Sequence, residues 1–149
     1  MMKSFFTFFL FLTLIGCEKM ESQNIVVHED TSNSEKQLLI DFEMIDLNGS
    51  IRSSSEWNNS AKLINFWATW CAPCRREIPL LNETQKNLSG MPIQIIGIAV
   101  DDFDEVLSYA ETTNFDYPIL IGEEDAVAVA ENSGVDFIGL PFTMIVTKD

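Results

Sequence analysis

Short apolar runs alternate with helix-like stretches from Leu38 onward, and this alternation is typical of an α/β domain. The predicted strands are 61–68, 93–100, 117–121 and 142–147, and the predicted helices are 75–88, 101–113 and 123–132. The runs 38–47 and 50–52 flank Asn48-Gly49, a turn dipeptide that favours positive φ. The pattern therefore predicts a central mixed sheet that is flanked by helices and opens with a β-hairpin.

The first 37 residues follow a different pattern. Lys3 gives a short positive start, and the apolar run 5–15 is too short to span a bilayer comfortably, so residues 1–16 are predicted to be a signal peptide. The run ends in Leu14-Ile15-Gly16-Cys17, which resembles the bacterial lipobox. Cys17 is therefore expected to become a lipidated N-terminus. The alternative is an ordinary signal peptide followed by an incidental cysteine.

Residues 17–37 are expected to form a flexible tether between this anchor and a single domain at 38–149. The stretch 18–37 is mostly polar and unpatterned, so it cannot bury enough apolar surface to order itself. The only histidine, His28, lies in this stretch and is assigned no role. Several acyl chains on one cysteine would hold the domain firmly at a membrane.

The chain is strongly acidic, with a formal net charge of -14 and only 9 Lys and Arg residues. This charge argues against a nucleic-acid partner, which requires clustered cations, and against electrostatic attraction to an anionic membrane surface. The hydrophobic fraction of 46% is typical of a folded domain. The acidity fits a solvated surface and also suits basic partners.

Cys71 and Cys74 are the two cysteines that remain once Cys17 is set aside. They are too close in sequence for a disulfide that would stabilise the fold. In an exported protein they are therefore interpreted as a redox pair. They lie where a buried strand passes into a helix, and the helix dipole lowers the pKa of a thiol at such a position. We expect Cys71 to attack disulfides and Cys74 to resolve the mixed disulfide. Pro73 is tolerated in the first turn.

Metal binding is the main alternative for a Cys-X-X-Cys motif. A structural zinc site needs four ligands, and the domain offers two cysteines and no histidine. We therefore predict no metal and no bound cofactor.

The segment 65–79 (NFWATWCAPCRREIP) resembles the active-site segment of TlpA/ResA-like proteins, a membrane-tethered branch of the thioredoxin superfamily. The order of aromatic residues, small residues and the Cys-X-X-Cys motif, with Pro79 five residues after Cys74, makes the match specific. The opening hairpin, the segment 139–141 and the lipobox fit the same family. The resemblance covers roughly 38–148 and implies a thioredoxin-like fold.

The resemblance also implies roles for individual residues. The proline that matches Pro141 is cis in the family and lies against the cysteine pair, so Leu140 and Pro141 are expected to form a substrate-docking edge. Pro141 can alternatively be a simple strand-start proline. The other substrate-binding residues are expected to be Trp70, Ala72 and Pro73.

Asn65 stands where ordinary thioredoxin has a buried aspartate, and an amide cannot exchange a proton. Glu77 matches the family's glutamate, so it is expected to move protons to and from Cys74. A surface glutamate without a role is the alternative for Glu77.

The resemblance implies a lipid-anchored thiol-disulfide oxidoreductase of the bacterial cell envelope, facing outside the cytoplasm. It implies a reductase of protein disulfides, in cytochrome c maturation or in reducing envelope proteins, with antioxidant activity. The protein is expected to be a monomer. A membrane electron-transfer partner would re-reduce it. The alternatives are an oxidant or isomerase of the same fold and a non-catalytic peptide-binding lipoprotein. The family's domain continues with an edge strand and a helix, so the sequence ending at Asp149 is expected to be truncated.

Overall fold

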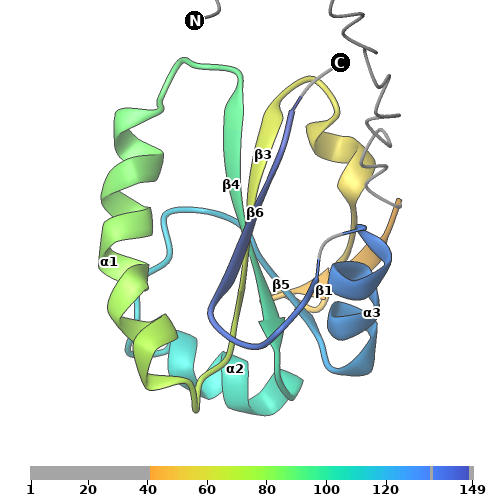
Figure 1. Cartoon of the computed structure of the whole chain (residues 1–149). Coiled ribbons are helices and arrows are strands. Elements are labelled where there is room, and N and C mark those ends of the chain that lie inside the picture. The colour runs from red at the N-terminus through yellow and green to blue at the C-terminus, as the bar shows by residue number, and fades with distance from the viewer. Residues whose placement is uncertain (1–40, 135, 148–149) are drawn as a thin grey trace, which may run out of the picture. The chain divides into compact units, whose positions relative to one another are not determined.

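A six-stranded mixed sheet with helices on both faces is formed by residues 41–134 and 136–147, which the computed structural model describes (Figure 1). The strands are β1 (Glu43–Asp46), β2 (Ile51–Ser53), β3 (Ala61–Trp67), β4 (Ile93–Val100), β5 (Ile119–Gly122) and β6 (Phe142–Val146). The helices are the short 3-10 helix η1 (Ser54–Trp57) and the α-helices α1 (Ala72–Asn87), α2 (Phe103–Ala110) and α3 (Glu124–Asn132). The predicted signal peptide and tether lie outside the described residues.

The strand order is β2-β1-β5-β4-β3-β6. The three neighbours β3, β4 and β5 are parallel, whereas β6 pairs antiparallel with β3, and β1 pairs antiparallel with both β2 and β5. Residues 95–99 in β4 are all buried, because helices cover both faces of the sheet at its centre. The expected α/β architecture with a mixed sheet is confirmed.

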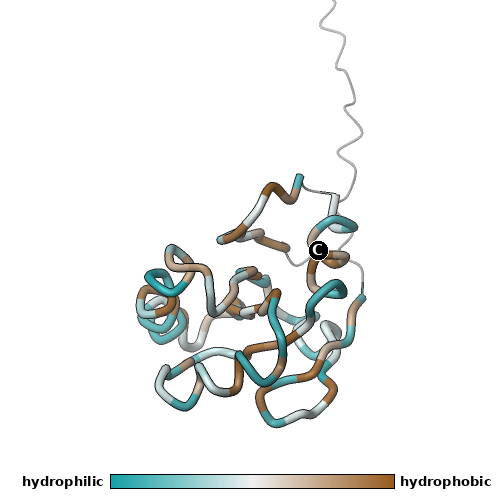
Figure 2. The backbone as a smooth tube through the Cα atoms, turned by 90° about the horizontal axis from the view of Figure 1, so that it is seen from below, coloured by the Kyte–Doolittle hydropathy of each residue, from teal (hydrophilic) through white to brown (hydrophobic). Residues whose placement is uncertain are grey.

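Two apolar clusters hold the helices on the sheet. One contains Cys74 and Ile78 of α1 and Val106 of α2, and the other contains Ala126 and Val129 of α3. The helices α1 and α2 therefore share one face, and α3 covers the opposite face. Figure 2 shows brown, apolar segments among teal, hydrophilic ones along the backbone.

The predicted hairpin forms at Asn48-Gly49, where Gly49 has a φ of 73°. The Asp46 carboxylate accepts hydrogen bonds from the N–H groups of Asn48 and Ser50, at 2.8 and 3.0 Å. Burial alone would raise the pKa of Asp46, but hydrogen bonds from this turn and from Arg52 outweigh it and hold the pKa below its ordinary value. The turn is thus built around one carboxylate.

Several element boundaries differ from the prediction. Helix α1 begins at Ala72, three residues earlier than expected, because Cys71 serves as its N-cap. Helix α2 is shorter than 101–113, because the Asp102 side chain caps its start and the Thr112 hydroxyl donates to the carbonyl of Tyr109 near its end. Strand β5 starts after Pro118, which has no N–H to donate.

Within the described ranges, no helix is both long enough and apolar enough to cross a membrane. The predicted continuation of the domain after Asp149 stays a prediction.

Candidate redox site at the start of helix α1

Cys71 and Cys74 form a disulfide at the start of α1, with their Cα atoms 5.3 Å apart. Cys71 is the N-cap residue, and the backbone N–H of Cys74 donates a hydrogen bond to the Cys71 Sγ at 3.3 Å. Both side chains are largely covered, Cys71 being 5% exposed and Cys74 1%. The predicted pair is thus a linked pair, and Cys71 is its more accessible member.

The start of α1 can stabilise negative charge on Cys71. Backbone N–H groups in a first helical turn have no partner within the helix, and the dipole places partial positive charge there. The N–H of Cys74 already points at the Cys71 sulfur. Pro73 falls in this turn, where the N–H that proline lacks is not needed. The local geometry therefore favours a thiolate on Cys71 when the disulfide is reduced.

Asp101 holds the segment that precedes Cys71. Its Oδ2 accepts hydrogen bonds from the backbone N–H and the hydroxyl of Thr69, at 2.8 and 2.7 Å. The next residue, Trp70, is 68% exposed. Sequence reasoning missed this role of Asp101, since the two residues are 32 positions apart and no motif links them.

The structure brings Asn65 and Glu77 together. Asn65 is 2% exposed, and its Nδ2 donates to Glu77 Oε2 at 3.4 Å and to Thr143 Oγ1 at 3.0 Å. Glu77 and Cys74 are three residues apart in α1, so they share one side of the helix. Thr143 was not foreseen, because it reaches Asn65 only through the pairing of β6 with β3.

The negative charge of Glu77 acts on Tyr117, a residue of the apolar cluster that contains the disulfide. Burial raises the pKa of the Tyr117 phenol, and the negative charge of Glu77 raises it further. Among the described residues, Tyr117 Oη and Trp67 Nε1 are buried without a hydrogen-bond partner. Both side chains belong to the same apolar cluster as Cys71 and Cys74.

The Leu140–Pro141 peptide bond is cis, as the resemblance implies. Leu140 packs against both apolar clusters, including the one that contains the cysteines. Ile138, which sequence reasoning did not single out, is 93% exposed just before this segment. Ala72 and Pro73, beside the disulfide, are also exposed.

In the part of the chain that the structure describes, no three His, Cys, Asp or Glu side chains are grouped so that they could hold a metal ion. Cys17 and His28 lie outside that part.

Comparisons with known proteins identify the family of the chain. A model of the AhpC/TSA family matches residues 36–149. The thiol-disulfide oxidoreductase ResA of Geobacillus kaustophilus is 33% identical over 110 residues, which cover 73% of this chain and 61% of that protein. The thioredoxin-like protein YneN of Bacillus subtilis is 26% identical over 99% of this chain and 86% of its own length. The chain spans about three fifths of the ResA proteins that it matches.

Among solved structures, a putative thiol-disulfide oxidoreductase from Bacteroides vulgatus superposes with a TM-score of 0.67 at 27% identity. The match covers 76% of this chain and 79% of that one. These findings confirm the resemblance to ResA-like proteins and the thioredoxin-like fold. Since the family model covers more than half of the sequence, the chain belongs to the AhpC/TSA family.

Proposed function

We propose that the protein is a thiol-disulfide oxidoreductase that exchanges the Cys71–Cys74 disulfide with disulfides of protein substrates. The observation that carries the proposal is the disulfide at the start of α1, with a backbone N–H directed at the Cys71 sulfur. A disulfide that closes only the first turn of a helix adds little to the fold, because the loop that it closes is very short. A role in thiol-disulfide exchange explains the presence of this disulfide better than a role in stability.

The exchange proceeds in two displacement steps. In the reduced protein, the Cys71 thiolate attacks one sulfur of the substrate disulfide, forms a mixed disulfide and releases the other sulfur as a thiolate. Cys74, as its thiolate, then attacks the Cys71 sulfur and releases the second substrate sulfur. Two electrons pass from the protein dithiol to the substrate, the two protons end on the substrate thiols, and the Cys71–Cys74 disulfide is formed.

Glu77 is proposed to accept the proton of the Cys74 thiol and to return it. Cys74 is almost fully buried, so its thiol cannot readily lose a proton directly to bulk water. Glu77 is partly exposed and belongs to the same side of α1, and Asn65 donates a hydrogen bond to its carboxylate. A carboxylate so held can accept the proton directly or through water.

The substrate is proposed to dock as an extended segment along Leu140 and Pro141, by strand-like pairing of backbone groups. The exposed residues Trp70, Ala72 and Pro73 lie beside the cysteines in sequence and complete the docking surface. Ile138 offers a further exposed apolar side chain next to that edge.

The proposed setting is the bacterial envelope, outside the cytoplasm, with the monomeric domain anchored through lipidated Cys17. The oxidising exterior has no thiol pool, so a membrane electron-transfer partner would restore the dithiol, without a bound cofactor. The direction proposed is reduction, of apocytochrome c cysteines or of oxidised envelope proteins. The midpoint potential of the Cys71/Cys74 couple distinguishes this direction from oxidation or isomerisation, since a reductant requires a low potential.

Insulin reduction tests the activity itself. The domain, kept reduced by dithiothreitol, is expected to accelerate precipitation of the insulin B chain, and Cys71→Ser is expected to abolish the acceleration. Equal activity in Cys71→Ser would contradict the proposal, and inactivity of the unmodified protein would favour a non-catalytic peptide-binding role. A Cys74→Ser variant should trap substrates as mixed disulfides on Cys71, which identifies them by mass spectrometry.

A further inference from the structure

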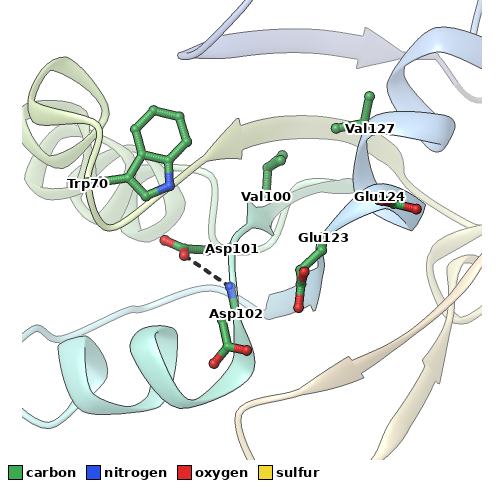
Figure 3. Close-up of a pocket in the computed structure, with 7 residues that line it drawn as sticks. All are labelled: Trp70, Val100, Asp101, Asp102, Glu123, Glu124 and Val127. Carbon is green, nitrogen blue, oxygen red and sulfur yellow. Dashed lines mark hydrogen bonds between the residues drawn. The ribbon is translucent and has the colours of Figure 1, made fainter.

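A pocket of about 430 Å³ lies beside the redox site (Figure 3). Its lining residues, here called the Trp70 pocket, are Trp70, Val100, Asp101, Asp102, Glu123, Glu124 and Val127. Val100 ends β4, Asp101 and Asp102 lead into α2, Glu123 precedes α3, and Glu124 begins α3. The pocket therefore sits at the carboxyl ends of two parallel strands, where open α/β sheets commonly bind ligands.

The pocket and the redox site share adjacent residues of the chain. Trp70, which forms one wall, immediately precedes Cys71. Thr69, which precedes Trp70, donates two hydrogen bonds to Asp101, and Asp101 lines the pocket as well. Because Trp70 is next to Cys71 in the chain, the pocket lies close to where a substrate would be joined to Cys71 in a mixed disulfide.

The lining combines an apolar surface with negative charge. Val100, Val127 and the exposed indole of Trp70 offer apolar contact, and four acidic residues complete the lining. Lys and Arg have this same combination, because an apolar stem carries a cation, and a cation also binds favourably over an indole face.

In the described ranges, two of the four carboxylates, those of Glu123 and Glu124, make no side-chain hydrogen bond. Asp101 accepts hydrogen bonds from Thr69, and the Asp102 side chain caps α2, whereas Glu123 is the N-cap residue of α3 but makes no side-chain capping bond. In the described ranges, the salt bridges join Arg52 to Asp46 and Glu56 and join Lys86 to Asp116, all outside the pocket. Glu123 and Glu124 are both exposed and can meet a cation supplied by a partner.

We propose that the Trp70 pocket binds a Lys or Arg side chain that lies close to the reacting cysteine of the substrate. The inference rests on the proposed thiol-disulfide exchange and gives it a substrate preference. The basic side chain lies along Trp70 and the two valines and places its charge among the carboxylates. Disulfides with basic neighbours are then reduced faster than disulfides with neutral or acidic ones.

The test uses three synthetic peptides, each a dimer joined by one disulfide, with Lys, Gln or Glu on both sides of the cysteine. The full chain is reduced, and the second-order rate constant is measured from the release of peptide thiol. Each constant is divided by that for reduction of the same peptide by dithiothreitol, because flanking charges alter the reactivity of the peptide itself. We expect the normalised constant for the Lys peptide to exceed that for the Gln peptide about fivefold. Added salt should shrink this ratio.

The double variant Glu123→Gln/Glu124→Gln is expected to reduce the ratio to half or less. The matched control is Glu83→Gln/Glu111→Gln, which removes the same charge from exposed positions outside the pocket and should keep the ratio. Equal normalised constants for all three peptides, or the same loss of preference in both double variants, would overturn the pocket proposal while leaving the exchange activity intact. Failure to reduce any of the peptides would instead contradict the proposed function, and the pocket proposal with it.

Discussion

Asn65 connects the active-site helix to the edge of the sheet. Its amide nitrogen donates to both Glu77 and Thr143, and the side chain is almost entirely buried. An amide at this position cannot take up a proton, but it can hold a carboxylate. The proton-transfer role is therefore proposed for Glu77, which is partly exposed to solvent.

The variant Glu77→Gln tests this assignment. Loss of the negative charge near Cys74 should favour thiolate formation, so we expect the pH profile of thiol alkylation in the reduced protein to move about half a pH unit or more toward acid. Folding should be preserved, because glutamine still offers an oxygen to Asn65. The exposed Glu83 of α1 supplies the control variant Glu83→Gln. Unchanged titration of both thiols in Glu77→Gln would refute the role.

Strand β4 packs tightly because one of its positions has no side chain. Gly97 lies opposite Asn65 of β3 and Ile119 of β5. A Cβ atom added to Gly97 would lie 2.7 Å from Ile119 Cδ1, 3.1 Å from Tyr117 Cε2 and 3.3 Å from Trp67 Nε1. The core beneath the disulfide therefore closes around this glycine.

Gly97→Ala is expected to lower the free energy of unfolding by about 1 to 3 kcal/mol, because overpacking forces buried side chains to shift. Ile119→Val removes the atom in closest contact, so the double variant should recover part of the loss. Urea unfolding of the two single variants and the double variant measures the coupling. Strictly additive losses would show that the two positions do not compete for space.

The turn between β1 and β2 should make stability depend on pH. The pKa of Asp46 is lowered in the folded state, so its contribution is complete above the ordinary aspartate pKa of 3.8 and is lost as the pH falls through the folded value. The stability difference between the unmodified protein and Asp46→Asn should be constant near neutral pH and should shrink in acid. Urea midpoints across this range provide the measurement. A difference that grows in acid would contradict the sign.

The proposed lipid anchor and the proposed redox chemistry lie at separate places in the chain. Cys17 precedes the domain by a polar stretch, and Cys71 lies inside the domain. The anchor would keep the redox site near a membrane partner without taking part in exchange.

Cys17→Ser therefore should move the protein, expressed in a bacterium with its complete N-terminal sequence, from the membrane fraction to the soluble fraction. One lipidated cysteine would supply the hydrophobic attachment. Cys71→Ser is the control and should remain with the membrane. Membrane association of Cys17→Ser at the level of the unmodified protein would argue against lipidation.

Features that depend on near neighbours in the chain could be predicted from the amino-acid sequence. Alternating and continuous apolar runs predicted the strands, Asn48-Gly49 predicted the hairpin, and the motif around Cys71 predicted the start of a helix. Each rests on backbone preferences or on the period of buried positions, and both act within a few residues.

Contacts that depend on the order of the strands could be found only in the folded protein. The pairing of β6 with β3 brings Thr143 to Asn65 across 78 positions, and the exit of β4 beside the active-site loop brings Asp101 to Thr69 across 32. The Trp70 pocket likewise needs the starts of α2 and α3 to meet beside that loop. No local pattern encodes these contacts, because they follow from the packing of distant elements on one sheet.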